Sequence, residues 1–86
     1  MSQSSQKVPT GRQIAAARTL LGLTQSDLAL RSAISVPTLK RMEGSDGAAS
    51  GMTNNVAAVC AALESAGVIF VAENGDGPGV RLRKAK

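Results

Sequence analysis

The feature that most constrains the fold of this 86-residue chain is a pair of helix-start signals spaced so closely that both helices must be short. Thr24, followed three residues later by Asp27, forms a capping-box pattern that opens a helix through about residue 32. Ser35 is the next N-cap candidate, and Pro37 suits the first turn of the helix that ends at Gly44. The spacing therefore predicts a helix-turn-helix over residues 24–43.

Further helices are predicted on both sides of this pair. Thr10 and Gln13 form another capping-box pattern, which opens a helix that ends at Gly22. A Gly- and Ser-rich loop over residues 44–53 precedes a helix predicted over 54–66. The apolar residues that recur on one face of that last helix are Val56, Val59, Cys60 and Leu63.

The C-terminal segment predicts a β-hairpin. Residues 68–73 are β-branched and aromatic, a Gly-rich turn follows, and apolar and basic residues alternate from residue 80. Because an isolated hairpin is marginally stable and its first strand is apolar on both faces, we expect the chain's own helices to cover one face and a second subunit the other. Whether two hairpins join edge to edge or stack stays open, as does a monomer in which Ile69 and Val71 are half exposed. The residues expected in the dimer contact are Val68, Ile69, Phe70, Val71, Val80 and Leu82.

The predicted organisation is a flexible arm over residues 1–8, a helix-turn-helix domain over 9–67 and a dimerisation hairpin over 68–86. The only aromatic residue is Phe70, so the core has to consist of aliphatic side chains and alanines, which favours closely packed helices. We expect a mainly α fold of four to five helices with a C-terminal hairpin.

Charge favours a polyanionic partner. The net charge is +4, and six basic residues face two acidic ones in the first 45 residues, whereas the remainder is neutral. With no His, no Tyr and no clustered acids, we expect no enzyme, cofactor or metal site. The solitary Cys60 is expected to be a small buried apolar residue in a reducing compartment. Since no apolar run is long enough to span a membrane, the expected location is the cytoplasm.

The segments LGLTQSDLA, residues 21–29, and AISVPTLKRMEG, residues 33–44, resemble the phage-repressor and Xre (lambda repressor-like) family of helix-turn-helix regulators. The resemblance covers residues 10–66. The ending GVIFVAENGDGPGVRL, residues 67–82, is similar to a short subset of such regulators found in bacteria and their mobile elements. Two departures are Ala33, where the family usually places glycine in the turn, and Val36-Pro37, which offers no polar side chain where base-reading groups are frequent.

The resemblance implies a sequence-specific transcriptional regulator, such as a repressor, that binds double-stranded DNA as a homodimer. The helix over residues 36–43 would enter the major groove, and the two half-sites of a pseudo-palindromic operator would lie about 34 Å apart. Arg41 is the first candidate for reading a base, because a guanidinium can donate twice to guanine, and Gln25 is the candidate for holding a phosphate. The expected DNA contacts are Thr24, Gln25, Ser35, Val36, Pro37, Thr38, Lys40, Arg41 and Asn54.

Arg18 and Glu43 have a structural role in this interpretation. Each shares an apolar helix face, and burying either charge alone would be costly, so we expect them to pair. Two alternative functions stay open at this point. One is an antitoxin that binds its own promoter and also neutralises a toxin partner, and the other is a protein-interaction module that has lost DNA binding.

Overall fold

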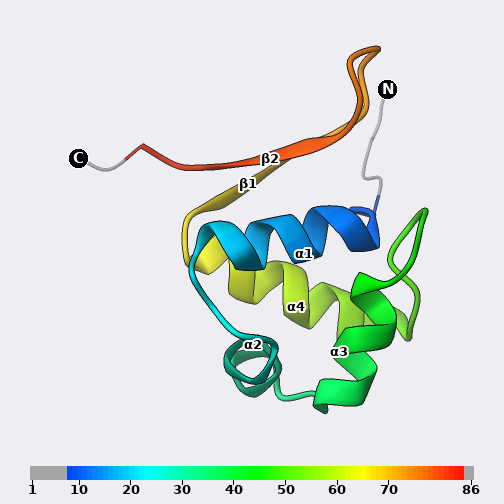
Figure 1. Ribbon diagram of the computed structural model, residues 1–86, viewed down its shortest axis with the longest axis vertical. Coiled ribbons are helices and arrows are strands. Elements are labelled where there is room, and N and C mark those ends of the chain that lie inside the picture. The colour runs from blue at the N-terminus through cyan, green and yellow to red at the C-terminus, as the bar shows by residue number, and fades with distance from the viewer. Residues whose placement is uncertain (1–7, 85–86) are drawn as a thin grey trace.

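In the computed structural model, which describes residues 8–84, four helices are followed by one antiparallel β-hairpin (Figure 1). The prediction of a small, mainly α fold with a C-terminal hairpin is confirmed. Within the expected arm, residues 1–7 lie outside the described residues, and Val8 is half exposed. The elements are α1 (Gly11–Leu20), α2 (Gln25–Ser32), α3 (Val36–Glu43), α4 (Thr53–Ser65), β1 (Val68–Val71) and β2 (Gly79–Leu82).

The first three helices begin where their caps were predicted, whereas α4, predicted over residues 54–66, spans Thr53–Ser65 and has no side-chain cap. The Thr10 hydroxyl accepts a hydrogen bond from the Gln13 N–H at 3.0 Å, and the Gln13 side chain accepts one from the Thr10 N–H at 2.8 Å. Thr24 and Asp27 exchange the equivalent bonds at 3.0 and 2.9 Å. Because both bonds favour the ionised carboxylate, they lower the pKa of Asp27 below its ordinary value. Ser35 caps α3 with its hydroxyl, which accepts from the Thr38 N–H without a reciprocal bond.

The core lies among the four helices and extends to the start of β1. Leu28 and Ala29 of α2 are buried in it, while Cys60 of α4, which was expected to be buried, is only partly so. The apolar face of α4 packs into the same core and completes the packing of the four helices. The buried apolar residues are Ile14, Ala17, Leu28, Ala29, Leu39, Met42, Val56, Val59, Leu63 and Val68.

The hairpin lies along α1 on the side opposite α2 and α3 (Figure 1). Val68 pairs with Leu82 and Phe70 with Val80, and because directly opposite residues point to the same face, these four share the face toward the helices. Phe70 and Val80 pack against the core. Leu82, in contrast, remains 43% exposed. Ile69, which pairs with Arg81, belongs to the outer face.

The first residue of α1 makes a close approach that only glycine allows. A Cβ atom on Gly11 would overlap the carbonyl oxygen of Met42 and lie 2.8 Å from that of Ser45. The Gly11 N–H donates to the Gly47 carbonyl at 3.2 Å, and Thr10 forms an isolated β-bridge with Ala48. The start of α1 is therefore fitted against the end of α3 and the loop that follows it.

Candidate functional site

The turn between α2 and α3 contains the one residue other than glycine with a positive φ among residues 8–84. Ala33 has φ 57° and ψ 42°, the left-handed conformation. Its N–H donates to the Leu30 carbonyl and the Ile34 N–H donates to the Ala29 carbonyl, so the last turn of α2 is closed by backbone hydrogen bonds. A Cβ makes this conformation costly. The structure thus places backbone strain at Ala33, in the turn between α2 and α3.

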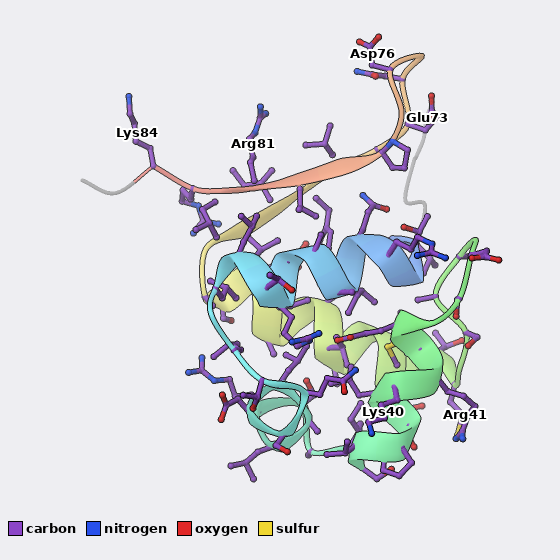
Figure 2. The ribbon with its side chains drawn as sticks, in the orientation of Figure 1. Lys40, Arg41, Glu73, Asp76, Arg81 and Lys84 are labelled. Atoms are coloured by element: carbon purple, nitrogen blue, oxygen red, sulfur yellow. The ribbon has the colours of Figure 1, made fainter. Side chains whose placement is uncertain are left out.

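The exposed surface of α3 carries two basic side chains. Figure 2 shows Lys40 and Arg41 on α3, on the side of the molecule far from the hairpin. Both are exposed, and neither takes part in an ion pair within residues 8–84. Pro37 is exposed as well. This surface therefore offers a guanidinium, an ammonium and an apolar ring to a partner.

Three other predicted contact residues are partly used inside the protein. The Ser35 hydroxyl accepts from the Thr38 N–H at 3.2 Å and donates to the Thr38 Oγ1 atom at 2.8 Å. Val36, which was expected among the DNA contacts, is half-buried and packs against the core. Ser35 is thus a cap, and the Thr38 hydroxyl keeps its own proton for an outside acceptor.

Behind α3 lies a buried polar network centred on Glu43. Arg18 donates from Nε to Oε2 of Glu43 at 2.8 Å and from a terminal nitrogen to Oε1 at 3.1 Å. Its other terminal nitrogen donates to the Leu23 carbonyl at 2.9 Å. The side chains of Arg18 and Glu43 are 19% and 6% exposed. The structure thus brings together the two charges that the sequence placed on apolar helix faces.

Gln25 belongs to the same network, which the sequence interpretation missed. Its amide nitrogen donates to Oε1 of Glu43 at 3.0 Å, and the side chain is half-buried. A primary amide has two N–H groups, so one of them is still available at the start of α2. Glu43 therefore fixes the orientation of the side chain that was expected to hold a phosphate.

The remaining predicted contacts, Thr24 and Asn54, lie at helix starts. Thr24 is exposed, but its hydroxyl is used as the cap of α2. Asn54 is exposed in the first turn of α4, a helix that begins after Met52 without a side-chain cap. Neither residue is joined to Lys40 or Arg41 by a hydrogen bond in the described part of the chain.

Gln13 has a second role that the sequence did not indicate. Beyond its part in the capping box, its amide nitrogen donates to the carbonyl oxygens of Val71 at 3.1 Å and Gly79 at 2.9 Å. The side chain is 7% exposed. One buried amide on α1 therefore holds the two strands of the hairpin at the end next to their turn.

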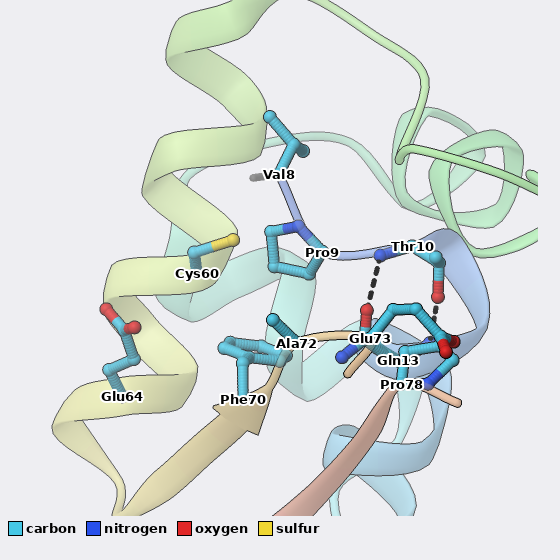
Figure 3. Close-up of a pocket in the computed structure, with 10 residues that line it drawn as sticks. All are labelled: Val8, Pro9, Thr10, Gln13, Cys60, Glu64, Phe70, Ala72, Glu73 and Pro78. Carbon is cyan, nitrogen blue, oxygen red and sulfur yellow. Dashed lines mark hydrogen bonds between the residues drawn. The ribbon is translucent and has the colours of Figure 1, made fainter. Parts of the chain in front are cut away.

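A groove of about 510 Å³ lies beside this contact, between α4, the hairpin and the start of the described chain (Figure 3). Phe70 and Cys60 form part of its wall, and Glu64 and Glu73 lie along it. Partial burial and the nearby Glu64 carboxylate raise the pKa of the Cys60 thiol to about 11. The thiol is therefore protonated at neutral pH.

Within residues 8–84, no group of three potential metal ligands is clustered, and no helix has the length and apolar character needed to cross a membrane. No family model matches the sequence, and a comparison with curated proteins gives no match either.

Proposed function

We propose that this protein is a sequence-specific, double-stranded DNA-binding regulator of the phage-repressor and Xre type, which acts as a homodimer on a pseudo-palindromic operator. The observation that carries this proposal is the placement of α3. Its exposed side presents Lys40 and Arg41, while its inner side is anchored through Glu43 to α1 and α2. A helix that recognises bases needs both exposed donor groups and an anchored inner side, since base recognition requires a side chain held in fixed geometry.

The chemistry of the exposed groups assigns their roles. Arg41 would donate two hydrogen bonds to O6 and N7 of a guanine in the major groove. Lys40 would lie against phosphate, where a flexible ammonium serves as a point charge. The free N–H of Gln25 would reach a phosphate at the start of α2. Pro37 would pack on a thymine methyl group.

The hairpin is proposed as the dimer contact, which would place one copy of α3 on each half-site. Its outer face carries Ile69 and Val71, both partly exposed. In addition, Leu82 is 43% exposed. A two-stranded hairpin gains stability when further strands or another apolar surface covers it.

A second candidate, the antitoxin, is favoured by exposed apolar side chains away from the hairpin. Leu30 on α2 is 82% exposed and Met52 is 67% exposed. Apolar groups of this size suit a protein partner such as a toxin better than they suit a phosphate backbone. Copurification of a tightly bound second protein would favour this function.

In the decisive experiment, the purified protein selects double-stranded DNA from a random pool, and the enriched sequences are footprinted. The binding is then repeated at several salt concentrations. A short palindromic footprint is expected. The Arg41→Ala variant should relax one base position in each half-site and lose about 1–3 kcal/mol of discrimination there. Lys40→Ala should weaken binding to all sequences equally and reduce the salt dependence.

Arg81→Ala is the matched control, because it removes the same charge from the hairpin, on the opposite side of the molecule (Figure 2). Base preference should be unchanged in this variant. Binding without any enriched sequence, or equal base preference in Arg41→Ala and the wild type, would overturn the proposal.

A further inference from the structure

The outer edge of β2 is an open edge of backbone donors and acceptors. The Arg83 N–H donates to the Gly67 carbonyl, so this pair is hydrogen-bonded. Because hydrogen-bonded and non-hydrogen-bonded pairs alternate along an antiparallel ladder, Val80 and Leu82 direct their own N–H and C=O groups outward. Among residues 8–84, no hydrogen bond to these outward groups is present. An edge of this kind is a template for another strand.

Apolar surface continues beside this edge. A shallow groove between α1 and β2 is lined by Ala16, Leu20 and Val80 among others. Leu20 is 48% exposed, and Leu82 farther along the strand is 43% exposed. A strand added to β2 would therefore also cover aliphatic side chains.

The two ends of the hairpin carry opposite charges. Glu73 and Asp76 lie at the turn, whereas Arg81 and Lys84 lie toward the other end, as Figure 2 shows. Arg83 adds to the basic end, and all five charged side chains are exposed. Two hairpins placed antiparallel bring unlike charges together at both ends, while two placed parallel bring like charges together.

We propose that β2 pairs edge to edge and antiparallel with β2 of a second copy of this chain, forming a four-stranded sheet across the dimer. This inference rests on the proposed function, in which the protein acts as a homodimer, and it specifies the surface and the direction of the pairing. A two-fold axis makes such a contact self-complementary, since each copy supplies the same edge.

The symmetry of this pairing suits DNA recognition. The two-fold axis between antiparallel edge strands runs perpendicular to the sheet, so the helices of both copies lie on the same side of the four-stranded sheet. Since α2 and α3 lie on the far side of α1 from the hairpin (Figure 1), both copies of α3 face one direction and can reach one duplex. Stacking the outer faces through Ile69 and Val71 would direct the two α3 helices away from each other.

The charges also favour one register. A ladder centred on Val80 places Arg81 beside the partner's Gly79, and it places Lys84 beside the partner's Asp76. A ladder centred on Arg81 puts the two copies of that arginine opposite each other, and one centred on Leu82 puts Arg81 opposite the partner's Arg83. Like charges directly opposite each other are destabilising, so charge favours the register centred on Val80. In this register Leu82 lies opposite the partner's Pro78, which accepts from the Leu82 N–H but has no N–H to donate in return.

Two charge-reversed proteins test this pairing by sedimentation without DNA. One carries Asp76→Lys and the other carries Arg83→Glu with Lys84→Glu, all at exposed positions. Each alone should dimerise about tenfold or more weakly than the wild type at low salt, because both ends of its dimer bring like charges together. An equal mixture should restore association as a heterodimer, and Arg31→Glu, an equally exposed change on α2, should have no effect.

The edge pairing would be overturned if both charge-reversed proteins dimerised as strongly as the wild type when tested alone, or if their mixture did not associate. A wild-type protein that is a monomer would overturn it as well.

Leu82→Pro gives a second test because it removes an outward N–H and leaves the ladder to β1 intact. This variant should be a monomer that keeps the wild-type circular dichroism spectrum, and a Leu82→Pro dimer would contradict the proposal. Failure of the pairing is distinguishable from failure of the proposed function, since DNA selection by α3 is scored separately on a single half-site.

Discussion

Two side chains of α1, the partly buried Arg18 and the buried Gln13, connect this helix to α3 and to the hairpin, and they differ in kind. Arg18 reaches α3 through a bidentate ion pair with Glu43 and also binds the Leu23 carbonyl. Gln13 reaches the hairpin through a neutral amide that binds the Val71 and Gly79 carbonyls. Breaking the ion pair leaves a buried charge, whereas breaking the amide contact leaves only polar groups. The contact between α1 and α3 is therefore expected to cost more free energy to break than the polar contact between α1 and the hairpin.

The largest effect is expected from removing Glu43. Glu43→Ala should lower the free energy of unfolding by about 3–5 kcal/mol, because Arg18 would be left partly buried without its partner. Urea denaturation followed by circular dichroism measures the change. Asp46→Ala is the matched control, since it breaks the ion pair between Arg12 and Asp46, whose side chains are 77% and 88% exposed, respectively. The expected loss in the free energy of unfolding there is below about 1 kcal/mol. An unchanged midpoint in Glu43→Ala would contradict the assigned role of the pair.

A smaller effect is expected at the neutral contact. Gln13→Met keeps a side chain of similar length but removes the N–H donor to the Val71 and Gly79 carbonyls, together with the oxygen that accepts from the Thr10 N–H. The variant should lose about 1–3 kcal/mol, the cost of unsatisfied buried groups, and the loss should fall on the hairpin and the first turn of α1. Hydrogen exchange at β1 and β2 should accelerate while exchange in α3 is unchanged. Equal acceleration in both regions would break the comparison between the two connections.

The smallest effect is expected at the turn that positions α3. Ala33→Gly removes the Cβ penalty of the left-handed conformation but adds chain entropy to the unfolded state. The net change should be a gain of about 0.5–1 kcal/mol in the free energy of unfolding, visible as a higher melting temperature. Ala29→Gly, in the buried part of α2, should be destabilising. Destabilisation by Ala33→Gly would show that the Cβ contributes contacts larger than its strain.

Local rules predicted much of this molecule because the relevant partners are close in sequence. Thr24 and Asp27 are three residues apart, and their bonds follow from helix geometry alone. The pairing of Arg18 with Glu43 could be predicted from the sequence for another reason. Each charge lies on an otherwise apolar helix face and needs an opposite charge beside it.

The contacts that were missed depend on tertiary placement. Gln13 and Val71 are 58 residues apart, and no pattern near either residue signals a hydrogen bond between them. The bond from Gln25 to Glu43 likewise exists only once α2 and α3 are docked. For the proposed DNA-contact surface, sequence alone could identify the exposed Lys40 and Arg41 but could not show that Val36 packs against the core.

In the proposed dimer on DNA, the absent side chain of Gly11 has a consequence for the spacing between the two copies of α3. A methyl group there would push the start of α1 away from the end of α3. Because α1 also holds the hairpin through Gln13, the same displacement would change the angle between the dimer contact and α3. In a symmetric assembly that change occurs in both copies, so an operator with the original number of base pairs between its half-sites would no longer fit. The choice of operator would thus depend on an atom that touches neither DNA nor the second subunit.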